Sequence, residues 1–375
     1  MSRKVLYFIK QPVHTRPPCM MEILTLHDMG IEVAVLTSSC SPEAKAQFAE
    51  KGIPCHTFTY KEFPFKPVRK VINYLHYRKV FRDFFKKYWT DDAVFWIGTE
   101  QSIVKYRPFL RNIHPVIQNC LEFYEQEWYQ EAMPQICREA DVTTACEPNR
   151  AQFMVDWWHL EKRPYILRNK PYSHPRTPRM EGSTPELREA IAQVQGKKTI
   201  LYQGAIEADR DLGLLAAALR EYNSEYYLVL SGPVKDDSLD RLKAMYDKVL
   251  YLGNLPSPFH MELASHADIC VAFYKDNSIN NRFCAPNKIY EYAGFGAPML
   301  CNPIPGLTET VGAAGAAECV DFHDAKAVID AIGRIDANPE AYRAASNAFF
   351  DNTDNTETLK ALLEDAFSKT KAERK

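Results

Sequence analysis

The chain has 375 residues, of which 46% are hydrophobic and 25% charged, a globular composition that excludes collagen-like, low-complexity and wholly disordered chains. At roughly 150 residues per domain, this length predicts two domains. Lysine and arginine (46) nearly balance aspartate and glutamate (48), so the net charge of −2 gives no reason to expect a nucleic-acid partner.

Ten cysteines are scattered without a C-x-x-C pair, and most lie in apolar runs. Reduced, buried thiols fit this pattern better than disulfides or a zinc site, so we expect a reducing compartment and no metal. Lys10 interrupts an amino-terminal apolar run that is too short for a signal peptide. No stretch reaches the ~18 apolar residues that span a bilayer. We therefore expect a cytoplasmic protein, at most peripheral on the inner face of the cell membrane.

Short apolar runs alternate with amphipathic stretches through the first half of the chain. This alternation predicts a parallel sheet covered by helices on both faces. The predicted strands are Lys4–Ile9, Ile31–Thr37, Ala93–Gly98, Pro115–Asn119 and Asp141–Ala145, and the predicted helices are Cys19–Met29, Pro67–Tyr88 and Glu122–Glu139.

A proline-rich break after these elements predicts an interdomain linker over residues 171–197. We expect an α/β protein of two doubly wound, Rossmann-like domains facing a cleft. The domains cover 1–170 and 198–345, and helices over 346–375 are able to cross back to the first. Strands of the second domain are predicted at Lys198–Gly204, Tyr226–Gly232, Val249–Gly253, Asp268–Tyr274, Pro298–Asn302 and Ala317–Val320.

Two segments of the second half have the chemistry of an anion site at the carboxyl ends of parallel strands. In "LYQGAIEADRDL", Gly204 ends a strand and lets backbone amides approach an anion, and Arg210 adds a cation near a helix that we expect to start at Asp209. The sequence has no G-x-G-x-x-G, which disfavours a nicotinamide-dinucleotide site.

The second segment is "NNRFCAPNKIYEYAGFGAP", a predicted short helix with Lys288, Glu291, Tyr292 and Phe295 on one face. A cation one turn before a carboxylate suits a nucleotide, because Lys288 can face the phosphates while Glu291 accepts hydrogen bonds from ribose hydroxyls. By spacing alone, the favoured interpretation is a surface ion pair of Lys288 and Glu291, with Tyr292 and Phe295 in the core.

These two segments, with "VLYLGNLPSPFHMELASHADICVAFY", resemble the carboxy-terminal domain of glycosyltransferase family 4, in colinear order over about Lys198–Glu309. The stretch "PNK-x-x-EY-x-x-x-G-x-P" resembles the branch that builds bacterial surface polysaccharides. The resemblance implies a GT-B fold and retaining sugar transfer from a nucleotide-sugar, with no metal and no cofactor. It implies that the donor is bound by Gly204, Arg210, Asn281, Asn287, Lys288 and Glu291.

Two positions depart from the family pattern. Glu291 matches the second glutamate of its E-x7-E motif, but Phe283 stands where the first belongs, so Asn280, Asn281 or a backbone amide is left to contact the sugar. Ala205 replaces the arginine that usually follows the glycine, and we expect Lys288 to supply the missing charge.

The resemblance also implies that the acceptor binds to the first domain, where the loop "KQPVHTRPPCMM" offers His14 and Arg16. Gly98 aligns with a histidine of many members, which leaves Glu100 and Glu122 as candidates to bind or polarise the acceptor hydroxyl. Each of these residues also has a simpler interpretation, as a solvated loop side chain or as an acid favoured by the helix dipole. Because the departing diphosphate can itself take the acceptor proton, we assign catalysis mainly to Arg210 and Lys288, with Glu100 as an accessory group.

Residues 61–90 are strongly basic and rich in aromatic residues. Nine lysines and arginines face only Glu62 and Asp83, which gives a local charge of +7 and leaves −9 for the rest of the chain. This pattern is typical of a segment that lies on an anionic membrane surface, or of a covering helix with solvated lysines.

The sequence thus predicts a retaining glycosyltransferase that moves a sugar from a nucleotide-sugar, UDP-linked in preference to GDP-linked, to a lipid-linked glycan. Two alternatives stay open: a non-catalytic subunit that binds nucleotide-sugars, and a sugar-nucleotide epimerase of the same fold.

Overall fold

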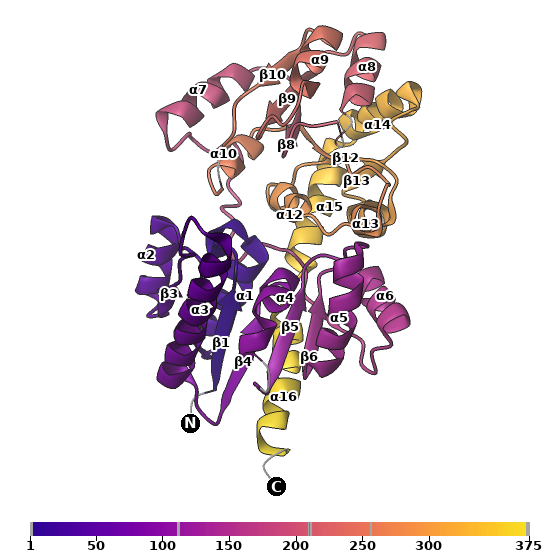
Figure 1. The fold of residues 1–375 in the computed structure, drawn as a ribbon. Helices are drawn as coiled ribbons and strands as arrows, with labels where there is room; N and C mark the ends of the chain where they lie inside the picture. Colours follow the sequence, from indigo (N-terminus) through magenta and orange to yellow (C-terminus); the bar gives the residue numbers. More distant parts are fainter. Residues whose placement is uncertain (1–2, 111–112, 209, 211, 256, 373–375) are drawn as a thin grey trace. The chain divides into compact units, whose positions relative to one another are not determined.

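The computed structural model describes residues 3–110, 113–208, 210, 212–255 and 257–372 (Figure 1). The chain forms two compact units, one made of Met1–Tyr172 with Asp354–Lys375 and the other of Ser173–Thr353. Each unit contains one parallel sheet, as the alternating apolar and amphipathic segments predict.

The first unit contains a seven-stranded sheet in the order β3-β2-β1-β4-β5-β6-β7, with every adjacent pair parallel. Its central strands are almost continuously apolar because both faces of the sheet are covered. The strands are β1 (Lys4–Ile9), β2 (Glu32–Thr37), β3 (Cys55–Thr57), β4 (Ala93–Ile97), β5 (Val116–Cys120), β6 (Val142–Ala145) and β7 (Tyr165–Ile166).

Alternate residues of β1 show how the two faces are filled. Val5 and Tyr7 belong to a core cluster with residues of α1 and α16, whereas Phe8 packs edge-on against Phe81 of α3 and Tyr106 of α4. The helical segments of this unit are η1 (Val13–Thr15), α1 (Pro17–Asp28), α2 (Pro42–Glu50), α3 (Lys66–Tyr88), α4 (Glu100–Leu110), α5 (Glu127–Glu139), α6 (Pro148–Trp158) and α16 (Thr356–Ala372).

The second unit contains a six-stranded parallel sheet in the order β10-β9-β8-β11-β12-β13. Its strands are β8 (Thr199–Gln203), β9 (Tyr227–Ser231), β10 (Val249–Tyr251), β11 (Ile269–Ala272), β12 (Met299–Cys301) and β13 (Ala317–Cys319). Its helices are α7 (Pro185–Val194), α8 (Gly213–Glu221), α9 (Ser238–Met245), α10 (His260–Ala264), α11 (Ile279–Arg282), α12 (Asn287–Gly294), α13 (Pro305–Leu307), η2 (Thr308–Gly312), α14 (Ala325–Ala337) and α15 (Pro339–Asn352).

The range 171–197 is not the simple linker that the prolines suggested. It contains α7, which is capped by the Thr184 hydroxyl and buries Ala190 and Val194 in the core of the second unit. The prolines before it hid this helix, although Leu187, Ala190, Ile191 and Val194 have the i, i+3, i+4, i+7 spacing of an amphipathic helix.

Some helix ends also differ from the predicted ones. The helix predicted from Glu122 begins at Glu127, because residues 121–126 form a loop whose carbonyl oxygens accept hydrogen bonds from the Tyr129 and Gln130 side chains of α5. The helix after β8 begins at Gly213, which leaves Arg210 in the preceding loop; Asp209 lies outside the described residues.

Candidate functional site

The carboxyl end of β8 approaches the neighbouring strand and helix closely. Gly204, directly after β8, has a φ of +148°, and a Cβ there would lie 3.0 Å from the Tyr202 hydroxyl and 3.2 Å from Lys288 Nζ. A Cβ on Gly232 would lie 1.9 Å from the Gly204 carbonyl oxygen. Glycine is therefore required at both positions, and Gly204 leaves room for the Lys288 amine.

Lys288 lies in the first turn of α12 and reaches back to β8. Its Nζ donates a hydrogen bond to the Gln203 carbonyl oxygen at 2.7 Å and lies over the rings of Tyr202 and Tyr274, 4.5 and 5.5 Å from their centroids. Burial, followed by the nearby positive charge of Arg210, lowers the pKa of Lys288 to about 8. A bound anion would relieve both effects.

Arg210 brings a second cation to the same aromatic ring. Its guanidinium carbon lies 4.4 Å from the centroid of Tyr274, and its Nη1 is buried without a hydrogen-bond partner among the described residues. Neither Arg210 nor Lys288 forms an ion pair within that part of the chain. A buried cationic donor without a partner is costly, and so are two neighbouring cations without a counter-ion, so this pair of side chains favours a bound anion.

Glu291 lies one turn further along α12 and is held by a residue that the sequence did not indicate. Its Oε2 lies 3.2 Å from His260 Nε2, at the start of α10, and both side chains are largely buried. Gln203 donates through Nε2 to the His260 carbonyl oxygen at 2.7 Å, which ties α10 to the end of β8. Glu291 is thus fixed in orientation, and the surface ion pair with Lys288 that spacing allowed does not form among the described residues.

The two asparagines predicted to bind the donor lie on α11 and α12. Asn281, on α11, donates to the Asn277 side chain at 2.8 Å, and Asn287 is the first residue of α12. Phe283 directly follows α11 and is half-buried, so no carboxylate occupies the position of the first family glutamate.

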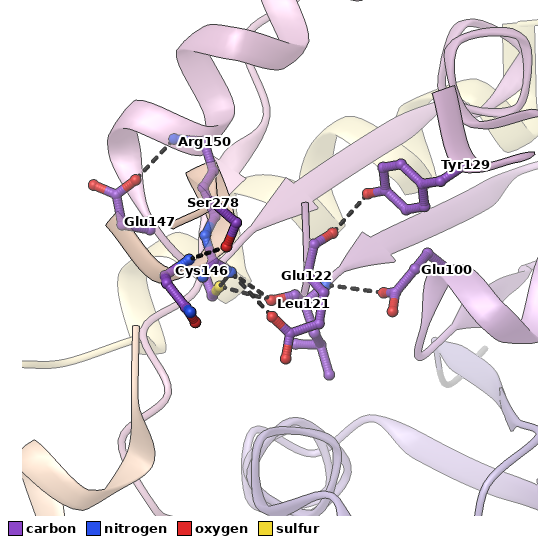
Figure 2. A network of polar contacts seen from close by, with 9 residues as sticks. Glu100, Leu121, Glu122, Tyr129, Cys146, Glu147, Arg150 and Ser278 are labelled. Atoms are coloured by element: carbon purple, nitrogen blue, oxygen red, sulfur yellow. Dashed lines mark hydrogen bonds and ion pairs between the residues drawn. The ribbon is translucent and has the colours of Figure 1, made fainter. Parts of the chain in front are cut away.

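In the first unit, Glu100 and Glu122 form an acidic pair at the carboxyl ends of β4 and β5 (Figure 2). Glu100 is only 2% exposed and accepts a hydrogen bond from the Leu121 amide at 3.3 Å. Burial, followed by the charge of Glu122, raises the pKa of Glu100 to about 7. Arg16 partly counters this shift.

Figure 2 also shows a buried arginine that the sequence did not suggest. Arg150, on α6, donates from Nη1 to the Leu121 carbonyl oxygen at 2.9 Å and lies 3.4 Å from a Glu122 carboxylate oxygen. The Glu122 carbonyl oxygen accepts from Tyr129 at 2.6 Å. The loop after β5 is therefore held from two helices, and the Glu122 side chain remains 41% exposed.

The loop after β1 places its two predicted residues differently. His14 accepts a hydrogen bond at Nδ1 from the Ser41 amide at 3.1 Å, so it anchors the start of α2. Arg16 is exposed and directly precedes α1. His14 therefore has a structural role in the loop, whereas the Arg16 guanidinium is exposed and can contact a ligand.

The described residues contain no group of three or more histidine, cysteine, aspartate or glutamate side chains arranged to hold a metal ion. No described helix combines the length and the apolar character needed to cross a bilayer.

Residues 197–338 match the family model described as Glycosyl transferases group 1, which confirms the glycosyltransferase resemblance of this region at that level. No curated protein matches the chain.

Solved structures match over nearly the whole chain. A glycosyltransferase from Rickettsia africae ESF-5 is 14% identical with a TM-score of 0.67, covering 99% of both chains. Anabaena HepE, in complex with UDP and glucose, is 12% identical with a TM-score of 0.68, covering 96% of this chain and 98% of its own. Sucrose-phosphate synthase from Thermosynechococcus elongatus is 16% identical with a TM-score of 0.61, covering 98% and 97%. At these identities the likeness concerns the fold, and the predicted GT-B fold of two Rossmann-like domains is confirmed.

Proposed function

We propose that the chain is a retaining, metal-independent glycosyltransferase of family 4. It takes a sugar from a nucleotide-sugar, UDP-linked in preference to GDP-linked, and transfers it to a lipid-linked glycan in surface-polysaccharide synthesis. One observation carries the proposal: Arg210 and Lys288 meet at Tyr274 as two cations without an ion-pair partner among the described residues. They lie in the region that matches the glycosyl transferase family model.

The geometry of this cluster suits a nucleoside diphosphate. Arg210 and Lys288 would bind the two phosphates, and the Gly204 backbone would let them approach the end of β8. Glu291, oriented by His260, would accept hydrogen bonds from the ribose hydroxyls. The complex of Anabaena HepE with UDP and glucose supports the choice of uridine.

The proposed chemistry needs stabilised charge more than a strong base. As the bond between the sugar carbon and the diphosphate oxygen breaks, negative charge grows on the diphosphate, where Arg210 and Lys288 stabilise it. The acceptor hydroxyl forms the new bond on the same face of the sugar and gives its proton to the departing diphosphate. Configuration is retained because leaving group and nucleophile share that face.

The acidic pair of the first unit supports the assignment of an acceptor site there. Glu100, with its pKa raised to about 7, would orient the acceptor hydroxyl by accepting a hydrogen bond from it. Glu122 and Arg16 are exposed enough to bind further acceptor hydroxyls or an acceptor phosphate. His14 would hold the loop after β1 in place through its hydrogen bond with the Ser41 amide.

Phe283 favours one alternative, a nucleotide-sugar-binding subunit without turnover, because it removes a carboxylate that the family uses at the donor. Product formation separates the two. The transferase converts nucleotide-sugar in the presence of an acceptor, whereas a binding subunit shows affinity alone. An epimerase of the same fold would instead change the sugar without any acceptor.

The first experiment is thermal stabilisation by UDP, GDP, ADP and NAD of the wild type and of Glu291→Ala. A ligand at ~100 times its dissociation constant stabilises the fold by roughly 2.7 kcal/mol, a readily measured rise in melting temperature. We expect a shift with UDP that Glu291→Ala loses. Stabilisation by none of the nucleotides would refute the donor site.

A further inference from the structure

Exposed apolar side chains are concentrated on one part of the first unit. Seven of the eleven large hydrophobic side chains that are exposed among the described residues lie within residues 60–75. Phe65 is 62% exposed and Leu75 57%. We call this surface the 60–75 patch, and it consists of Tyr60, Phe63, Phe65, Val68, Val71, Tyr74 and Leu75.

The packing of α3 separates this patch from the core. Tyr77, Phe81 and Phe84 are buried, so much of the aromatic content of residues 61–90 belongs to the fold. Val71 and Leu75 lie on the opposite, outward side, one turn apart. The structure thus divides the segment into a buried aromatic half and an exposed apolar half, which the sequence alone could not do.

Asn73 gives the patch a defined shape. Its side chain is buried, accepts a hydrogen bond from the Lys61 amide at 2.8 Å, and donates to the carbonyl oxygens of Lys61 and Arg69 at 2.8 and 2.9 Å. The loop that carries Phe63 and Phe65 is therefore fixed against the first turns of α3. Less backbone ordering is then needed when the exposed rings bind a surface.

Positive charge surrounds the apolar patch. Residues 61–90 have nine basic side chains, of which only two pair with a carboxylate among the described residues: Arg69 with Glu62 and Arg82 with Asp83. The outward face that is apolar at Val71 and Leu75 continues along α3 as basic residues, including Arg78, Lys79, Lys86 and Lys87.

We propose that the 60–75 patch and the basic face of α3 dock on an anionic lipid bilayer, with the apolar side chains at the boundary between headgroups and acyl chains. Exposed apolar side chains next to lysines fit a bilayer, whose acyl chains are apolar and whose headgroups are negatively charged. A second copy of this surface would meet a charge of the same sign, which opposes self-association. The proposal concerns the first unit only and does not depend on the donor site.

The test is sedimentation of the full chain with vesicles of phosphatidylglycerol and phosphatidylcholine, against vesicles of phosphatidylcholine alone. Each basic residue near such a surface contributes about fivefold to partitioning, so Lys66→Gln/Lys70→Gln should weaken binding about 30-fold. Phe65→Ser/Leu75→Ser should weaken it about 10-fold or more through lost apolar burial. All four side chains are exposed, so the fold should be retained.

Matched controls lie on the second unit. Lys235→Gln/Lys243→Gln removes the same charge, and Tyr222→Ser/Val234→Ser removes exposed apolar side chains of similar kind. Both controls should bind anionic vesicles as the wild type does. If the control variants lose as much vesicle binding as the patch variants, binding depends only on net charge or total exposed apolar surface, and the proposal is overturned.

Two further outcomes would also overturn it. One is the absence of binding to anionic vesicles at low salt, where electrostatic attraction is strongest. The other is tight, salt-dependent binding of single-stranded RNA that is lost in Lys66→Gln/Lys70→Gln while vesicles are ignored. If the protein binds nucleotide but not vesicles, the membrane proposal fails while the proposed donor site stands. The two proposals can therefore be refuted separately.

Discussion

The affinity for UDP should depend on the protonation of Lys288. In the free protein, burial and Arg210 hold the pKa of this amine at about 8, whereas a bound diphosphate should return it toward its ordinary value of 10.5. Binding above pH 8 must then take up a proton. From these values we expect the dissociation constant for UDP to rise about fourfold between pH 7 and 8.5, through this group alone.

The assay is isothermal titration of UDP across this pH range with the wild type, Lys288→Arg and Lys288→Met. The arginine variant keeps the charge at every pH, so its profile gives the contribution of the ligand and of all other groups. Lys288→Met should bind about 10- to 100-fold more weakly at pH 7, because it loses a charged hydrogen bond to phosphate. A wild-type profile that parallels Lys288→Arg would refute the placement of the amine at the diphosphate.

Three further predictions concern two residues that support the donor site, Gly204 and His260, and a buried carboxylate on α1 of the first unit, Glu22. Gly204→Ala should weaken UDP binding in the same titration, because the new Cβ would displace the Lys288 amine; an unchanged affinity would contradict the close approach. His260→Ala should weaken UDP binding less than Glu291→Ala does, since it removes only the group that orients the carboxylate; the reverse order would show that His260 itself contacts the ligand. Glu22 is fully buried and its pKa is raised to about 8, so the stability that it contributes is complete below its ordinary pKa of 4.5 and is lost as pH rises through 8. By pH 7 the free energy of unfolding has fallen by about 3 kcal/mol through this group. In urea denaturation from pH 5 to 8, Glu22→Gln should not show this fall. A variant with the same pH profile as the wild type would exclude a neutral Glu22.

Strands and their order along the chain were predictable because each is a local apolar run. The predicted segment Lys4–Ile9 coincides with β1, and all six strands predicted for the second half are present, within one or two residues at their ends. Two short strands, β3 and β7, went unpredicted, since β3 is Cys-His-Thr, with two polar residues of three, and β7 is a single Tyr-Ile pair. The helix α7 was hidden by the prolines before it.

The chemistry at the end of β8 was only half visible in the sequence. Arg210, Lys288 and Glu291 could be selected by residue type and spacing. Tyr202 and Tyr274 could not be selected, because nothing local distinguishes a tyrosine that packs under a cation from one in the core. His260 could not be selected either, because its contact with Glu291 joins residues that are far apart in the sequence.

By itself the sequence determined the GT-B class, the alternation of strands and helices, and which charged residues follow the strands of the second sheet. All of these are local patterns or matches in order along the chain. Only the tertiary structure decided which groups meet: Lys288 with the Gln203 carbonyl oxygen, 85 residues apart, and Glu291 with His260. It also decided which side of α3 is buried. Burial and contact depend on how distant segments pack, and burial is what gives Lys288 its lowered pKa and leaves the 60–75 patch exposed.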